Sequence, residues 1–161
     1  MAIKIYSKNR SGVKTLRNKN KGFTLIELLV VIAIIGLLAS VVLLALNSAR
    51  QKARDAKRLA DVRQFASAFE LYFNDKSSYP TIGFTSPTVM TTALMQTAGL
   101  APNYIGVIPA APTPSDTPCT DTTNAYTYQG GANAYTLTFC LGQQTGGYGQ
   151  GGHTMTQAGI Q

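Results

Sequence analysis

The sequence predicts an α+β fold in which a long amino-terminal helix, membrane-spanning in its first half, packs on a small carboxy-terminal antiparallel β-sheet. Three observations support this prediction. An apolar run covers residues 25–46, a helical pattern without proline continues to residue 79, and two runs of alternating apolar and polar residues lie near the carboxyl end. With 161 residues, only a small globular part remains once the apolar run is set aside.

Residues 1–22 form a basic leader. They hold seven of the 14 Lys and Arg residues and no acid, so the net charge of +7 lies entirely in this segment. Phosphate binding needs a folded basic surface, which such a polar tail does not offer, and we predict no direct nucleic-acid binding. Positive charge before the first apolar segment instead predicts a cytoplasmic amino terminus, with the carboxy-terminal part outside the membrane.

Residues 23–46 are predicted to form a transmembrane helix. Glu27 and Ser40 are the only clearly polar residues of the apolar run, which at ~1.5 Å per residue spans the ~30 Å hydrocarbon core of a bilayer. A domain this small has no interior for an apolar cylinder of that length. A secretory signal peptide cut within residues 45–49 is the alternative, but the run is too long for one and contains an acid.

The helix is expected to continue as an amphipathic segment over residues 47–74 and to end before Pro80. An apolar stripe at three- and four-residue spacing should pack on the carboxy-terminal domain. The stripe consists of Val62, Phe65, Ala66, Phe69, Tyr72 and Phe73. The charged residues lie mostly off the stripe and predict a solvated face for most of them, with ion pairs between subunits as the alternative use; they are Arg50, Arg54, Asp55, Lys57, Arg58 and Asp61.

Residues 75–161 are predicted to be a loop followed by a small β domain. Residues 90–98 are moderately helical and Gly99 could cap them, whereas residues 105–114 read as a proline-stiffened loop. Residues 126–129 and 134–141 alternate and are joined by a Gly-Gly-Ala-Asn turn, which predicts a β-hairpin. The bulkier side chains of the second strand should face the helix; they are Tyr135, Leu137, Phe139 and Leu141.

The last part of the chain gives weaker predictions. Residues 142–152 are rich in Gly and Gln and predict a mobile loop, and residues 153–156 are expected to supply a short last strand. Cys119 and Cys140 are the only cysteines. Outside the membrane they are expected to form a disulfide, with two buried thiols as the alternative.

The sequence does not predict an enzyme. A catalytic site gathers a nucleophile and base, paired carboxylates or metal ligands. Here the single histidine, His153, lies in a Gly-rich tail, and the acids beyond the long helix are few. We therefore expect no catalytic residues, no metal site and no cofactor.

A specific motif spans the junction between the leader and the apolar run. It reads Lys21-Gly22-Phe23-Thr24-Leu25-Ile26-Glu27, followed by an unbroken apolar helix. This combination closely resembles the class III signal sequence of type IV pilins and type II secretion pseudopilins. The resemblance is strong over residues 17–46 and lies in the arrangement of elements beyond them, so it implies a pilin-like fold.

The resemblance implies processing and assembly roles. Prepilin peptidase would cut between Gly22 and Phe23 and N-methylate Phe23. Glu27 would pair with the freed α-amine of Phe23 on a neighbouring subunit, since a carboxylate in hydrocarbon is tolerated when an opposite charge meets it; reaching the lipid headgroups is the alternative. The implied partners are the peptidase, copies of itself and other pilins, an inner-membrane assembly platform, and the bilayer before assembly.

The predicted function is a structural subunit of a type IV pilus-like extracellular filament. Before assembly it would be a single-pass cytoplasmic membrane protein, and afterwards part of a cell-surface filament. One alternative is a pseudopilin of a type II secretion or DNA-uptake system, and another is a membrane-anchored surface binding protein that does not polymerise. The chain has no Trp and no acid after Asp121, so the calcium loop of many pseudopilins is not expected, and the Cys119–Cys140 pair looks like the disulfide-bounded region of a pilin.

Overall fold

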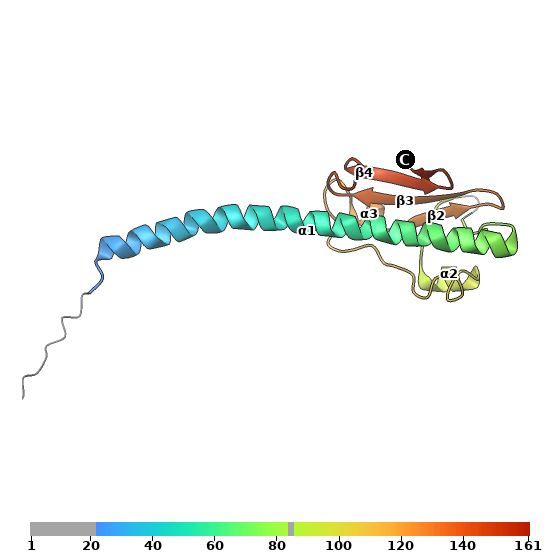
Figure 1. Ribbon diagram of the computed structural model, residues 1–161, viewed down its shortest axis with the longest axis horizontal. Coiled ribbons are helices and arrows are strands. Elements are labelled where there is room, and N and C mark those ends of the chain that lie inside the picture. Colours follow the sequence, from blue (N-terminus) through green and yellow to red (C-terminus); the bar gives the residue numbers. More distant parts are fainter. Residues whose placement is uncertain (1–21, 84–85) are drawn as a thin grey trace, which may run out of the picture. The chain divides into compact units, whose positions relative to one another are not determined.

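The computed structural model describes residues 22–83 and 86–161. The predicted leader lies outside the described residues, apart from Gly22. The chain divides into two compact units, Met1–Ser40 and Val41–Gln161, and we call the part of the second unit from residue 47 onward the head. One helix, α1 (Leu25–Lys76), begins in the first unit and ends in the head (Figure 1). Its bounds agree with the predicted helix within two residues at either end.

The described part of the first unit is the beginning of α1. Its large apolar side chains are exposed, from Leu25 at 84% to Val30 at 48%. The hydroxyl of Ser40 donates to the carbonyl oxygens of Leu37 (2.8 Å) and Gly36 (3.2 Å), so its hydrogen bonds stay within the helix. Among the described residues, α1 is the helix that is long and apolar enough to cross a membrane.

The head contains a five-stranded antiparallel sheet with the strand order β1-β2-β3-β4-β5. The strands are β1 (Thr88–Val89), β2 (Thr127–Gly130), β3 (Tyr135–Leu141), β4 (Gly151–Thr156) and β5 (Gly159–Ile160). Leu137 in the central strand lies opposite Tyr128 on one side and Met155 on the other. The predicted hairpin is confirmed as β2 and β3.

Two predictions for the sheet need correction. The strands β1 and β5 were not predicted, because two residues are too few to show an alternating pattern. Residues 142–152 are not wholly a loop, since β4 already begins at Gly151, which pairs with Leu141. Within this segment Thr145 and Tyr148 exchange two main-chain hydrogen bonds of 3.0 and 3.1 Å. Pairing with β3 thus determines where β4 begins, and the glycine-rich sequence alone does not predict that position.

The core lies between α1 and the sheet. Phe69 packs its ring against Tyr128 and Tyr135, with centroid separations of 4.8 Å, and Phe65 packs against Tyr126 at 5.6 Å. The predicted inward face of β3 is confirmed, because its four bulky side chains are at most 2% exposed. Within the predicted stripe, Ala66 is only half-buried. Aromatic and aliphatic burial therefore holds the helix on the sheet.

Two short helices complete the head. The predicted helix near residues 90–98 is present as α2 (Thr92–Thr97), and Gly99 follows it with φ +77°, a left-handed conformation that glycine adopts without strain. A second short helix, α3 (Asp121–Asn124), was not predicted. Its first turn is capped by Thr120, whose hydroxyl accepts a hydrogen bond from the main-chain nitrogen of Thr123 (3.3 Å).

The prediction of a solvated charged face on α1 is wrong for half of its residues. Asp55 and Arg58 are 0% exposed and Asp61 is 8% exposed. Lys57 contacts Asp61 at 2.6 Å, and Arg54 contacts Asp116 at 2.5 Å. The burial of Asp55 and Arg58 depends on partners far along the chain, which the spacing along one helix does not reveal; these partners are Asn124, Gly142 and Gln143.

Candidate processing and assembly site

Gly22 and Phe23 precede α1 and lie outside any regular element. Phe23 is 88% exposed, and a Cβ atom added at Gly22 would meet no other atom within 4 Å. The peptide bond between them is therefore accessible in non-helical chain, which is the kind of segment that proteases cut.

Thr24 and Glu27 form a reciprocal hydrogen-bonded cap at the start of α1. Oε2 of Glu27 accepts hydrogen bonds from the main-chain nitrogen (2.8 Å) and the hydroxyl (2.7 Å) of Thr24. The hydroxyl oxygen of Thr24 in turn accepts from the main-chain nitrogen of Glu27 at 3.3 Å. This is a capping box, and the acid also faces the positive end of the helix dipole.

The role of Thr24 was not predicted, although the sequence carries the signal. Thr-x-x-Glu before an apolar run is the spacing of a capping box. In the uncut chain, the carboxylate of Glu27 thus has two partners on its own subunit. Both partners are neutral groups, so the carboxylate has no opposite charge within the described part of the chain.

Phe23, just before α1, and Glu27, in the first turn of α1, lie at the same place on the surface. They border the same shallow hollow, which is lined by Phe23, Ile26, Glu27, Val30 and Val31. The structure therefore brings the predicted cleavage position and the predicted assembly contact to one apolar surface.

The remaining candidate residues lie in the head. Cys119 and Cys140 are joined by a disulfide. His153 lies on β4, where its ring packs near Phe139 and its Nε2 atom lies 2.8 Å from the main-chain oxygen of Gly149. Within residues 22–83 and 86–161, no group of three or more His, Cys, Asp or Glu side chains could hold a metal ion.

Comparisons with known proteins find similarity over part of the chain. A family model described as the prokaryotic N-terminal methylation motif matches residues 17–43, which include Gly22, Phe23 and Glu27. Type II secretion system core protein G of Klebsiella michiganensis is 43% identical over 65 residues, covering 40% of this chain and 46% of that protein. The Escherichia coli protein of the same name is 42% identical over 64 residues, covering 40% and 44%.

A pilus protein is similar to a comparable extent. The type IV wide pilus major component PilA4 of Thermus thermophilus is 48% identical over 59 residues, covering 37% of this chain and 45% of that protein. The chain thus spans less than half the length of these curated relatives. No solved structure matches significantly. The chain therefore carries a prokaryotic N-terminal methylation motif and is homologous, over 37–40% of its length, to type II secretion system core protein G and to a type IV pilus component.

Proposed function

We propose that the chain is a prepilin, the precursor of a structural subunit of a type IV pilus-like extracellular filament. Prepilin peptidase cuts it between Gly22 and Phe23 and N-methylates Phe23, and the mature subunit polymerises through its apolar helix. The observation that supports this best is the exposed apolar surface of residues 25–46, with Leu25 84% and Leu44 75% exposed. Such a surface needs a bilayer or the helices of other subunits to cover it.

Cleavage creates a positively charged partner for the Glu27 carboxylate, which has none among the described residues of the uncut chain. Hydrolysis before Phe23 creates an α-amine one residue from Thr24, the present partner of Glu27. A protonated amine adds the attraction of an opposite charge to the hydrogen bond, and the low dielectric of surrounding apolar side chains strengthens that attraction. In the proposed filament, Glu27 therefore contacts the Phe23 amine of a neighbouring subunit in addition to, or in place of, its own Thr24.

We propose that the subunit lies first in the membrane and then in the filament. Before assembly, the subunit spans the cytoplasmic membrane once, with the amino terminus in the cytoplasm and the head outside. An inner-membrane assembly platform then transfers it into a cell-surface filament together with copies of itself and other pilins. The apolar run of α1 is thus covered by lipid first and by other helices afterwards.

A pseudopilin of a type II secretion or DNA-uptake system is the second candidate. The similarity to type II secretion core protein G of several bacteria favours it. The two candidates share processing and helix packing and differ in the system that the filament serves. Deleting the gene in the native host separates them: loss of surface filaments supports the pilus, and loss of a secreted protein or of DNA uptake without loss of surface filaments supports the pseudopilus.

The assembly contact is tested by Glu27→Ala, with Ser40→Ala as the matched control. Both changes remove a polar group from the apolar run, but the hydroxyl of Ser40 bonds only within its own helix. We expect both variants to insert into the membrane, and only Glu27→Ala to lose filaments that can be sheared from the cell. Normal filament yield from Glu27→Ala would overturn the proposed pairing, and membrane-inserted wild-type protein that never forms filaments would favour a non-polymerising surface protein.

A further inference from the structure

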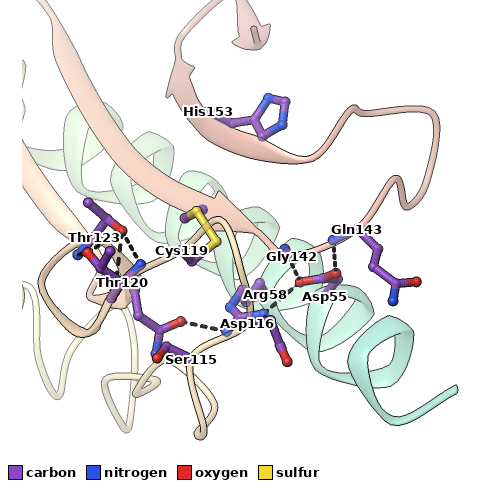
Figure 2. The surroundings of a disulfide bond; sticks show 12 residues. Asp55, Arg58, Ser115, Asp116, Cys119, Thr120, Thr123, Gly142, Gln143 and His153 are labelled. Carbon is purple, nitrogen blue, oxygen red and sulfur yellow. Dashed lines mark hydrogen bonds and ion pairs between the residues drawn. A yellow bond between two sulfur atoms is a disulfide. The ribbon is translucent and has the colours of Figure 1, made fainter. Parts of the chain in front are cut away.

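The head contains a charged cluster that contacts the chain on both sides of the disulfide. We call it the clamp and define it as Arg54, Asp55, Arg58 and Asp116. The first three residues lie on α1, and Asp116 lies shortly before Cys119 in the sequence. Figure 2 shows three of its residues, Asp55, Arg58 and Asp116, near the disulfide, with Gly142 and Gln143 beside Asp55.

One end of the clamp fixes the segment after Cys140. The carboxylate of Asp55 accepts hydrogen bonds from the main-chain nitrogens of Gly142 (3.0 Å) and Gln143 (2.8 Å), and from Nη1 of Arg58 (2.6 Å). Asp55 is 0% exposed. A buried carboxylate is held this firmly only when its oxygen atoms are satisfied, so the chain leaving β3 is tied to α1.

The other end fixes the segment before Cys119. The carboxylate of Asp116 accepts two hydrogen bonds from Arg54, of 2.7 Å from Nε and 2.5 Å from Nη2. Nη1 of Arg58 lies 3.6 Å from the same carboxylate. The main-chain oxygen of Asp116 accepts from the nitrogen of Cys119 at 2.6 Å. The position of Cys119 is thus coupled to the anchored carboxylate.

Arg58 joins the two ends. It contacts both carboxylates, and its Nη2 atom donates to Oδ1 of Asn124 at 2.5 Å. Its side chain is fully buried. Both cysteine-bearing segments are therefore anchored on the same stretch of α1 through contacts that involve no sulfur atom.

We propose that the clamp brings Cys119 and Cys140 together before they are oxidised, so that the disulfide locks a head that has already folded. In the oxidation, an external disulfide accepts the two electrons. One cysteine thiolate attacks it and releases a thiolate, the second cysteine thiolate displaces the other, and the two protons pass to the released thiolates. Holding the two thiols in place raises their effective concentration for this second step. The proposal concerns the head alone and does not depend on filament assembly.

The first experiment measures how firmly the disulfide is held, using the full chain in detergent micelles. The protein is equilibrated with mixtures of reduced and oxidised dithiothreitol, and the oxidised fraction is determined by thiol labelling. We expect Asp116→Asn and Arg54→Gln each to lower the effective concentration of the two thiols at least tenfold. The control Lys57→Gln removes an ion pair with Asp61 on the same helix. The other partner of Lys57 is the main-chain oxygen of Ala110 (3.2 Å), which is not part of the clamp, so this variant should leave the value unchanged.

The second experiment removes the sulfur atoms. In the double variant Cys119→Ser and Cys140→Ser, we expect the main-chain amides of Gly142 and Gln143 to stay protected from hydrogen exchange, because their acceptor is Asp55. Loss of that protection would overturn the proposal, since the disulfide would then be what builds the clamp. Wild-type effective concentration in Arg54→Gln would also overturn it. If Asp116→Asn unfolds the head, Arg54→Gln still tests the proposal, because the Arg54→Gln variant keeps the contact between Arg58 and Asp116.

Discussion

The two halves of α1 share one backbone conformation and have opposite surroundings. In residues 25–46, the large apolar side chains are 41–84% exposed. In the second half, Val62, Phe65 and Phe69 are 0% exposed and pack against the sheet. The difference shows that apolar residues have two separate roles in one helix. The second half finds its partner within the chain, whereas the first half needs a partner outside it.

The acidic residues of the two halves also differ in their partners. Glu27, in the first half, has only neutral hydrogen-bond donors from Thr24. Asp55, in the second half, meets Arg58 in a fully buried ion pair. Removing one partner of such a buried pair leaves an uncompensated charge in the interior. Substitutions in the second half should therefore change the stability of the head, and substitutions in the first half should change assembly.

The largest effect on stability is expected from Phe69→Ala. The ring of Phe69 is fully buried among three aromatic rings, so its loss should cost about 3–5 kcal/mol of unfolding free energy. The control Leu71→Ala removes a side chain that is 56% exposed on the same helix and should cost ~0.5 kcal/mol or less. Denaturant unfolding of the full chain in micelles measures both, and equal losses would contradict the described core.

High pH should destabilise the head and leave the first half of α1 helical. Burial raises the pKa of Tyr79 and of Tyr135 to about 12. An unfolded tyrosine has a pKa of about 10, so these residues contribute stability that is complete below pH ~10 and is lost as the pH rises toward the folded values. Residues 23–46 contain no tyrosine. Thermal unfolding between pH 9 and 12 tests this; an unchanged midpoint across that range would contradict it.

Low pH should weaken the clamp by a smaller amount. The hydrogen bonds from Arg54 hold the pKa of Asp116 below its usual value, and the charges of Arg54 and Arg58 act in the same direction. A lowered pKa contributes stability above the unfolded value of ~3.9, and this contribution is lost as the pH falls through the folded value. We expect unfolding free energies measured from pH 6 downward to fall less in Asp116→Asn than in the wild type. Parallel curves would exclude this contribution.

The smallest effect on the head is expected from Ile34→Ala. Ile34 is 52% exposed and lies in the apolar run, so the unfolding free energy of the head should change by less than ~0.5 kcal/mol. The same variant should lower filament yield, since the side chain packs against other helices in the proposed filament. A destabilised head with a normal filament yield would contradict the assignment of the first half of α1 to assembly and of the second half to the stability of the head.

The sequence predicted the features that depend on local patterns. The bounds of α1, the β2–β3 hairpin and the inward face of β3 follow from apolar periodicity and turn residues. The buried state of Asp55 and Arg58 does not, because, apart from the ion pair between them, their hydrogen-bond partners lie 54–88 residues away. The cap between Thr24 and Glu27 is a local pattern that could have been recognised from its spacing.

The proposed cleavage between Gly22 and Phe23 is tested most directly by mass spectrometry of the amino terminus. The protein is purified from the native host, both from membranes and from sheared filaments. We predict a mature chain that starts at Phe23 and carries one methyl group on its α-amine. A chain that still begins at Met1, or one that begins within residues 45–49, would contradict the proposal.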